Sequence, residues 1–327
     1  MERNRSERFS RLLRYYGVEN EDILAAFDEV PREHFIATKR NHWNVYLDEV
    51  VVTYNDGVNF STSSQPSLMA MYMYWGKLKE DSVVLEIGSG TGYNAAVMSR
   101  VCRKGIVYGV EYVKEMVEFA NDAIRTLGYD NVLITQGDGY FGLQEHAPFD
   151  AIIVTVGAYT ISPYWYRQLR ESGKMVVPIN LETLRSNPTI VLKKTNDRLI
   201  GAFTSHTRFI KMKGESERKY FEKLEKLRSL EKCKYAGERK WWMPLDVTEF
   251  VSQRVYCSTE VYYIGNNGYA RLKGDRWLMF GNVEKSLKKL EEAWNNTGRK
   301  GLFRLRYTIT FDEEGNMEVE MRENRGT

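Results

Sequence analysis

The chain has 327 residues, of which 43% are hydrophobic and 28% are charged. This is enough apolar material for a buried core, and the length is typical of two domains. Lys and Arg total 47 against 44 for Asp and Glu, which gives a net charge of +3. That near balance argues against a protein dedicated to nucleic acid, which would carry a strong basic excess.

Cysteine usage and hydropathy point to a cytoplasmic protein. Cys102, Cys233 and Cys257 lie far apart and share no zinc-ligand spacing with histidine, so we expect no metal site and no disulfide framework. Residues 1–17 alternate charged with apolar side chains and lack the continuous apolar core of a signal peptide. No apolar stretch approaches the ~20 residues that a membrane-spanning helix needs, so we expect no membrane partner.

The N-terminal quarter of the chain is predicted to be mainly helical. Residues 5–16 and 20–28 have the periodicity of short amphipathic helices. Residues 40–66 show no sustained helical period and contain an Asn-Asp-Gly turn signal. A mostly apolar helix is then expected at 68–78, with a proline close to its start.

From residue 82 onward, short apolar runs alternate with helical patterns. This alternation predicts right-handed crossovers and a doubly wound, mostly parallel sheet of α/β type, covered by helices on both faces. Two further strands separated by a short turn must be antiparallel. The expected parallel strands are 83–87, 106–110, 132–134, 151–155 and 174–178, the helices lie around 95–98 and at 114–127 and 164–170, and the closing antiparallel pair is 189–193 and 199–204.

The last third of the chain has a different pattern. Residues 213–232 are highly charged and predict a solvated helix that links two domains. Beyond them, strand-like runs around one helix indicate a smaller α+β domain. We therefore expect a first domain at 1–212, in which 1–80 form a helical and loop part that contributes to the active site, and a second domain at 213–327. The strands of the second domain are predicted at 258–264, 268–272, 276–280, 303–310 and 316–321, and its helix at 283–295.

A glycine-rich turn, Glu86-Ile87-Gly88-Ser89-Gly90-Thr91-Gly92, separates the first parallel strand from its helix. Glycines in such a turn allow positive φ angles or let the backbone approach a ligand, and ligands bind at the carboxyl ends of strands in doubly wound sheets. The alternative is a tight turn without a ligand. The spacing G-x-G-x-G differs from the dinucleotide fingerprint G-x-G-x-x-G, which disfavours a dinucleotide-dependent oxidoreductase.

Two acidic residues follow the next two strands. Glu111 ends the second parallel strand, where a carboxylate could accept hydrogen bonds from ribose hydroxyls; the alternative is a solvated strand end. Asp138 follows the third strand within Gly137-Asp138-Gly139 and could hold an adenine amino group. The three strand ends together form a constellation that is more specific than any one of them.

With these segments the sequence resembles the S-adenosylmethionine-dependent methyltransferases of the Rossmann-like class. More narrowly, it resembles the protein-L-isoaspartate (D-aspartate) O-methyltransferases over roughly residues 20–212. The remaining residues look like the extension that some members carry. The motifs that carry the narrower resemblance are Val30-Pro31-Arg32-Glu33-His34-Phe35, Ser64-Gln65-Pro66, Gly137-Asp138-Gly139, Ala147 to Thr155, Gln168-Leu169, Gly173 and Val176-Val177-Pro178.

The resemblance implies methyl transfer from S-adenosylmethionine to the α-carboxylate of L-isoaspartyl residues in damaged proteins, with S-adenosylhomocysteine as the product. A carboxylate is already ionised at pH 7, so this chemistry needs no general base and no catalytic triad. The cofactor-binding residues that we predict are Gly57, Val58, Asn59, Phe60, Met69, Glu86, Gly88, Ser89, Gly90, Gly92, Glu111, Gly137, Asp138 and Gly139.

Ser64 matches the serine that the family treats as its active-site residue, and we expect its hydroxyl to orient the substrate carboxylate. The alternative is a helix N-cap, the usual role of a serine that precedes a helix. A covalent nucleophile is disfavoured because no G-x-S-x-G motif surrounds Ser64.

The acceptor side departs from the family pattern. Ser67 stands where many members have histidine, and residues 50–63 differ from the usual segment before the serine. Two alternatives therefore remain: a carboxyl methyltransferase for another peptide or modified-peptide carboxylate, and a non-catalytic binding protein on the same fold. For residues 213–327 we expect a role in homodimer formation or in substrate access.

Overall fold

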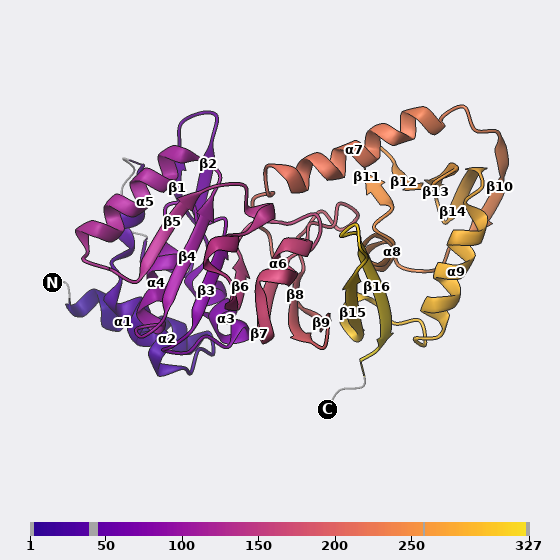
Figure 1. Ribbon diagram of the computed structural model, residues 1–327. Coiled ribbons are helices and arrows are strands. Elements are labelled where there is room, and N and C mark those ends of the chain that lie inside the picture. The colour runs from indigo at the N-terminus through magenta and orange to yellow at the C-terminus, as the bar shows by residue number, and fades with distance from the viewer. Residues whose placement is uncertain (1–2, 39–44, 258, 325–327) are drawn as a thin grey trace. The chain divides into compact units, whose positions relative to one another are not determined.

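The computed structural model describes residues 3–38, 45–257 and 259–324 (Figure 1). The chain divides into two compact units. The first comprises Met1–Val156 and Tyr164–Val176, and the second comprises Gly157–Pro163 and Val177–Thr327. The expected methyltransferase domain, 1–212, and extension, 213–327, are functional divisions that do not coincide with these units, and they stay predictions.

The predicted helices of the N-terminal region are confirmed. Helix α2 begins after Asn20, whose side-chain oxygen accepts a hydrogen bond of 3.0 Å from the backbone N–H of Ile23. This helix packs on α1 and α4 and buries Ile23 and Phe27. Part of the segment predicted to be non-helical, 40–66, lies outside the described residues, and the rest contains an antiparallel hairpin around the predicted turn. The elements are α1 (Arg3–Tyr15), α2 (Glu21–Glu29), η1 (Arg32–Phe35), β1 (Val51–Asn55), β2 (Phe60–Ser63) and α3 (Pro66–Gly76).

The first unit contains the predicted parallel sheet, with strand order β7-β6-β3-β4-β5. Its apolar strands are almost fully buried, as expected for a sheet packed against helices. The chain proceeds from β3 to β5 in one direction and then returns to place β6 on the other side of β3. This reversal next to β3 is the topological position at which ligands bind. The strands are β3 (Val83–Ile87), β4 (Ile106–Glu111), β5 (Val132–Gln136), β6 (Phe149–Val154) and β7 (Leu169–Pro178), and the helices are α4 (Tyr93–Val101), α5 (Lys114–Thr126) and α6 (Pro163–Gln168), with η2 (Gly139–Phe141) and η3 (Gln144–His146) between them.

Strand β7 begins earlier than predicted. Leu169 already pairs with Phe149, although the sequence pattern predicts a helix to residue 170 and a strand only from 174. The register shifts between Phe149 and Ala151, and residues 170–172 are exposed. The first half of the strand therefore lacks the apolar run by which its second half is recognised.

In the second unit, β8 (Thr189–Thr195) and β9 (Arg198–Ser205) form the predicted antiparallel pair. The other edge of β9 pairs with β15 (Leu305–Phe311), which in turn pairs with β16 (Met317–Glu323). The last two predicted strands are thus confirmed as strands. Their grouping with the other C-terminal strands is wrong, because they extend the β8–β9 pair into the order β16-β15-β9-β8.

The other C-terminal strands form a separate antiparallel sheet in the order β10-β14-β13-β12-β11. The strands predicted at 268–272 and 276–280 and the helix predicted at 283–295 are confirmed, and so is the part of 258–264 that lies after residue 258, which is outside the described residues. Strands β10 and β11 and helix α8 were not predicted. The elements are β10 (Tyr235–Lys240), α8 (Leu245–Ser252), β11 (Val255–Cys257), β12 (Val261–Ile264), β13 (Gly268–Lys273), β14 (Arg276–Gly281), α9 (Glu284–Asn295) and η4 (Leu302–Arg304).

The charged stretch 213–232 forms helix α7 (Glu215–Leu230). The prediction that this helix is solvated is wrong for one of its faces. Tyr220 and Leu227 are buried in an apolar cluster with Tyr159, Tyr256 and Ile264. Helix α7 is therefore amphipathic and belongs to the core of the second unit.

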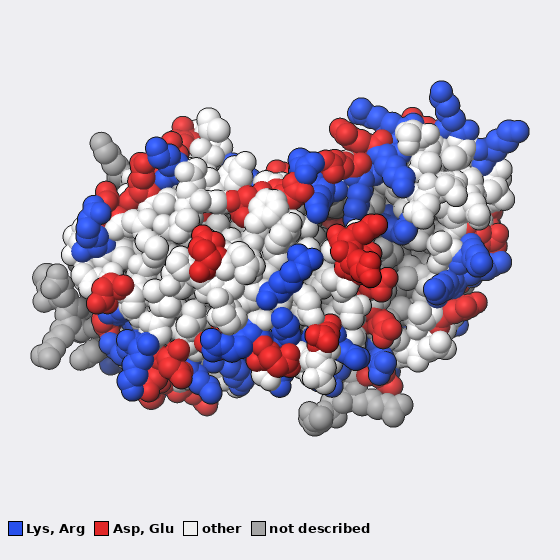
Figure 2. Space-filling view, viewed as in Figure 1, with Lys and Arg blue, Asp and Glu red and all other residues white. Residues whose placement is uncertain are grey.

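The surface of the protein carries both signs of charge. Figure 2 shows Lys and Arg beside Asp and Glu over much of the visible face, and on α7 Arg218 pairs with both Glu215 and Glu222. Within the described ranges, no helix is long and apolar enough to cross a membrane. The same part of the chain contains no group of three His, Cys, Asp or Glu side chains that could hold a metal ion.

Candidate active site

The glycine-rich turn has the backbone geometry that only glycine adopts easily. Gly88 and Gly90 have φ angles of +87° and +54°. A Cβ atom on Gly88 would lie 2.5 Å from Cγ1 of Val156, and one on Gly90 would lie 2.6 Å from Oγ of Ser61. The turn is anchored to β4, since the backbone N–H groups of Gly88 and Ser89 both donate to the carbonyl oxygen of Val110. Both reasons for glycine, positive φ and close approach, therefore apply here.

Glu111 is bound to this turn. Its Oε2 atom accepts a hydrogen bond of 2.9 Å from the N–H of Gly90, and its Oε1 atom accepts one of 2.9 Å from the N–H of Val113. The residue is 8% exposed, so the alternative of a solvated strand end is wrong. The carboxylate is held at the carboxyl end of β4, beside the glycine turn, and each of its oxygens has a second lone pair free to accept from a ligand.

Glu86 is a buried acid beneath the turn. Its Oε1 atom accepts a hydrogen bond of 2.6 Å from Nδ2 of Asn94. Burial raises the pKa of Glu86 to about 7, against the lowering effect of the bond from Asn94. Among the described residues, neither Oε2 of Glu86 nor Oδ1 of Asn94 finds a hydrogen-bond donor. Two buried acceptors without a donor are suited to a ligand that brings N–H groups.

A pocket with an empty volume of about 380 Å³ lies at the carboxyl ends of β3 and β6, entirely within the first unit. It joins the glycine turn to the segment that follows β2. Its lining residues are Thr62, Ser63, Ser64, Met69, Glu86, Gly88, Ser89, Gly90, Thr91, Tyr93, Asn94 and Thr155.

The structure brings together six of the predicted site residues and places others nearby. Ser64, Met69, Glu86, Gly88, Ser89 and Gly90 line the pocket. Glu111 reaches the pocket wall through Gly90, and Gly92 packs against α5, where a Cβ would lie 2.9 Å from Cβ of Ala120.

The Gly137-Asp138-Gly139 segment lies level with these strand ends but outside the lining. The N–H of Gly137 donates to the carbonyl oxygen of Glu111, at 2.9 Å. Oδ1 of Asp138 accepts from the N–H of Tyr140, at 2.9 Å, and caps a short 3₁₀ helix. The carbonyl oxygen of Gly139 accepts from Nε1 of Trp165, at 2.7 Å.

Residues Gly57 to Phe60 lie at the turn of the β1–β2 hairpin and outside the pocket lining. Val58 is 86% exposed. Asp56 organises the turn, because its Oδ1 atom accepts from the N–H groups of Asn59 and Val58, which lower the pKa of Asp56 to about 2. The predicted contact of Gly57, Val58, Asn59 and Phe60 with the cofactor stays a prediction.

Six lining residues were not predicted: Thr62, Ser63, Thr91, Tyr93, Asn94 and Thr155. Thr91 and Tyr93 belong to the glycine-rich motif itself, and Thr62 and Ser63 belong to the hydroxyl-rich run before Ser64. These sequence signals could have found them. Asn94 and Thr155 carry no local signal, because their place depends on the packing of α4 and the end of β6 against β3.

Ser64 is not the N-cap of α3. The cap position is Gln65, which makes no side-chain capping bond. Asp48 takes this role from a distant segment: its Oδ1 accepts from the N–H of Ser67 at 2.8 Å, and its Oδ2 accepts from the Ser67 hydroxyl at 2.7 Å. The alternative reading of Ser64 is therefore wrong, and Ser67 has a partner that accounts for a small hydroxyl residue at this position.

A parallel sheet with this strand order, a glycine-rich turn after β3, a buried acid ending β4 and a pocket where the strand order reverses define the Rossmann-like methyltransferases that use S-adenosylmethionine. The residues fit that cofactor, because the unpartnered acceptors of Glu86 and Asn94 suit its ammonium group and Glu111 suits its ribose. The sequence model of the protein-L-isoaspartate(D-aspartate) O-methyltransferase family matches residues 4–217. The chain belongs to this family.

Relatives of known name include two with similar identity. A protein-L-isoaspartate O-methyltransferase of Thermotoga maritima is 38% identical over 297 residues, which cover 89% of this chain and 92% of the relative. One from Fervidobacterium nodosum is 37% identical over 202 residues, covering 61% and 97%. The Thermotoga relative therefore matches most of the C-terminal region as well, which identifies this chain as a long form.

Two solved structures support the fold. A protein-L-isoaspartate O-methyltransferase superimposes with a TM-score of 0.81 at 36% identity and covers 96% of this chain and 99% of its own. A beta-aspartate methyltransferase from Plasmodium falciparum, solved in complex with S-adenosyl-L-homocysteine, gives a TM-score of 0.53 at 24% identity and covers 63% and 96%. The second likeness concerns the fold alone.

Proposed function

We propose that this protein transfers a methyl group from S-adenosylmethionine to the α-carboxylate of L-isoaspartyl residues in damaged cytoplasmic proteins, as a repair enzyme. The observation that carries the proposal is the pocket in which Ser64, the residue matched to the acceptor side, and the glycine turn, matched to the cofactor, line one cavity. A binding protein without activity would not need both.

The chemistry requires alignment rather than proton transfer. When bound, S-adenosylmethionine supplies an electrophilic methyl group on a positively charged sulfur. The acceptor carboxylate is ionised at pH 7 and acts as the nucleophile: a C–O bond forms, the S–C bond breaks, and a methyl ester and S-adenosylhomocysteine result. Ser64 orients the carboxylate by donating its hydroxyl hydrogen bond, and the pocket wall excludes water from two opposite charges that neutralise each other.

On the cofactor side, each polar residue has an assigned partner. We assign the ribose hydroxyls to Glu111, the adenine amino group to Asp138 and the ammonium group to Glu86 and Asn94. The positions of Glu111 and Asp138 at the ends of adjacent strands β4 and β5 support this order. Gly88, Ser89, Gly90 and Met69 line the space between them.

The test compares two synthetic peptides that differ only in one residue, L-isoaspartate or normal L-aspartate, with transfer followed by mass spectrometry. We expect a methyl ester on the isoaspartyl peptide alone. Equal rates with both peptides would reject the repair assignment, and so would the absence of transfer to either.

The second candidate is a methyltransferase for another peptide carboxylate, and the acceptor wall favours it. The segment 50–63 and Ser67 depart from the family pattern, and the Asp48–Ser67 hydrogen bonds show that this wall has its own construction. A screen of carboxylate-bearing peptides with mass detection separates the two candidates. Transfer to a peptide without isoaspartate, in preference to the isoaspartyl peptide, identifies the second.

For the C-terminal extension, we propose a role in homodimer formation or in access of the substrate. Strand β16 is the last strand in the order β16-β15-β9-β8, and an edge strand of this kind can pair with a second copy. Light scattering on the full chain tests this. We expect a mass twice that of the 38.2 kDa monomer, and a monomer at every concentration would contradict the dimer.

A further inference from the structure

Arg32 is a fully buried cation beside the acceptor wall. Its exposed fraction is 0%, and burial lowers the pKa of its guanidinium. It lies in η1, in a segment that the sequence analysis associates with the family but to which it gives no function. A buried guanidinium is costly unless every donor is satisfied, so its position calls for an explanation.

The donors of Arg32 are satisfied by neutral oxygen atoms. Within the described residues, no carboxylate forms an ion pair with Arg32, and its charge is left without a counter-ion. The acceptors are the carbonyl oxygens of Val45 (2.8 Å), Leu47 (3.4 Å), Glu49 (3.2 Å), Ser63 (3.2 Å) and Ser64 (2.8 Å) and the hydroxyl of Ser63 (3.0 Å from Nη2 and 3.2 Å from Nε).

These bonds join two separate segments to one side chain. Nη1 holds the carbonyl groups of the chain around Val45, while Nη2 holds both Ser63 and Ser64. Ser63 and Ser64 line the pocket. Because the carbonyl group of Ser64 is fixed on Arg32, the backbone that carries the Ser64 hydroxyl is fixed as well. The ring of Tyr93, which also lines the pocket, lies 5.5 Å below the guanidinium.

We propose that Arg32 is a positioning residue for the acceptor: it holds the Ser63–Ser64 backbone so that Ser64 meets the substrate carboxylate, and its uncompensated charge favours an anionic acceptor at this wall. The inference rests on the proposed function and deepens it. The charge acts before the reaction more than after it, because the acceptor is an anion and the methyl ester is neutral. Binding of the substrate and release of the product are both favoured.

Other charged groups face this region and act in the same direction or weakly against it. Asp48 is directed to the first turn of α3 by its two bonds to Ser67. Glu86, on the cofactor side of the pocket, is partly protonated near neutral pH because of its raised pKa. Neither carboxylate forms an ion pair with the guanidinium, so the positive charge of Arg32 is available to an incoming carboxylate.

The experiment compares Arg32→Gln, which removes the charge, with Arg32→Lys, which keeps it and loses the planar fork. Two quantities are measured on the full-length protein: KM and kcat for the isoaspartyl peptide, and the affinity for S-adenosylhomocysteine by calorimetry. For Arg32→Gln we expect KM for the peptide to rise by at least about tenfold, while the affinity for S-adenosylhomocysteine stays within about twofold. Arg32→Lys should show a clearly smaller rise in KM.

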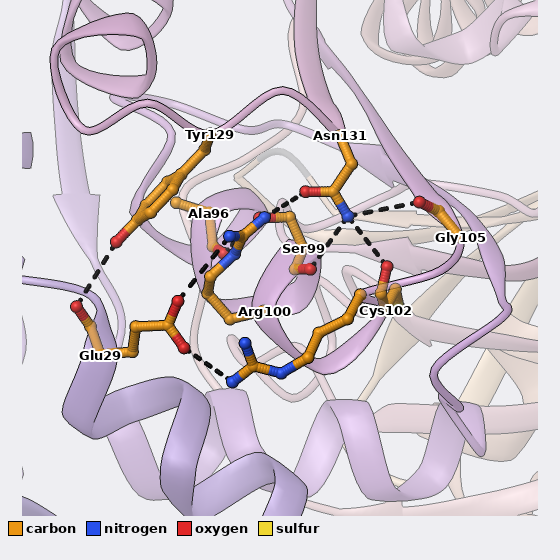
Figure 3. A network of polar contacts seen from close by, with 9 residues as sticks. Glu29, Ala96, Ser99, Arg100, Cys102, Gly105, Tyr129 and Asn131 are labelled. Carbon is orange, nitrogen blue, oxygen red and sulfur yellow. Dashed lines mark hydrogen bonds and ion pairs between the residues drawn. The ribbon is translucent and has the colours of Figure 1, made fainter.

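Arg100 provides a matched control, because it is also an arginine with little exposure in the first unit. Its guanidinium bonds to Asn131, pairs with Glu29 at 3.7 Å and lies over the ring of Tyr129 at 4.4 Å, in a network that lies outside the pocket lining (Figure 3). Arg100→Lys removes a similar set of bonds without touching the acceptor wall. We expect it to lower stability and to leave KM for the peptide unchanged within about twofold.

Ser63→Ala keeps the proposal testable if Arg32→Gln does not fold. It removes one acceptor of Arg32 and leaves the charge, so KM for the peptide should rise by a few-fold with unchanged affinity for S-adenosylhomocysteine. Arg32 is merely structural if its variants lose peptide and cofactor binding by the same factor, if Arg32→Lys equals Arg32→Gln, or if KM does not change in Arg32→Gln or, failing that, in Ser63→Ala. Absence of isoaspartyl methylation by the unmodified protein would reject the proposed function itself, which distinguishes the two failures.

Discussion

Replacing Ser64 with alanine will lower kcat for the isoaspartyl peptide about 10- to 100-fold and leave the affinity for S-adenosylhomocysteine within about twofold. A hydrogen bond to a charged group contributes about 1.5–3 kcal/mol, and the hydroxyl of Ser64 donates to an acceptor that is an anion until the methyl group arrives. The cofactor side of the pocket is built from other residues, so its affinity should be insensitive to the change.

Steady-state kinetics on the peptide and calorimetry with S-adenosylhomocysteine measure the two effects. Ser67→Ala is the matched control: it removes a hydroxyl only three residues away, but one that bonds to Asp48 rather than lining the pocket. It should lower stability by about 1 kcal/mol and change kcat little. A tenfold loss of cofactor affinity in Ser64→Ala with unchanged kcat would contradict the role assigned to Ser64.

Replacing Glu86 with glutamine will remove a pH dependence of stability of about 3 kcal/mol. Burial raises the pKa of Glu86 from 4.5 to about 7 in the folded protein. Below pH 4.5 the carboxyl group is neutral in both states and its contribution to stability is fully present. As the pH rises through about 7, the folded protein must hold a buried charge, and the free energy of unfolding falls. Glutamine stays neutral and can keep the hydrogen bond from Asn94.

Urea unfolding of both proteins between about pH 5 and pH 8 measures this. The stability of the variant relative to the unmodified protein should increase steadily across that range. Glu249 also has a pKa raised to about 7 by burial, but it is present in both proteins and cancels in the difference. Parallel stability curves would show that Glu86 does not titrate in the folded state.

Local sequence patterns predict the parallel sheet because its buried strands are apolar runs and its glycine turn has a distinctive spacing. They do not predict β10, whose residues Tyr235–Lys240 are mostly exposed and include three charges. Nor do they predict that β15 pairs with β9, since the partners are distant in sequence and either strand has the same local pattern whichever neighbour it takes.

The candidate site divides in the same way. Ser64 and the glycine turn carry motifs and are found from the sequence, and the pocket brings them together. Arg32 is part of a quoted motif, yet its role depends on carbonyl oxygens that the fold collects from 45–49 and 63–64. The sequence cannot show such acceptors, because every residue has a carbonyl group. The turn at Gly57–Phe60 lies outside the lining because Asp56 closes the hairpin there.

The pairing of β9 with β15 has a consequence for synthesis on the ribosome. Strand β9 is translated well before its partner, because α7, the five-stranded sheet and α9 all lie between them in sequence. Until the last residues emerge, one edge of β9 presents unpaired backbone groups, and an open edge can recruit a neighbouring nascent chain. A premature stop codon late in the reading frame would leave this edge permanently open, so even short C-terminal deletions should lower the yield of native protein from the cell.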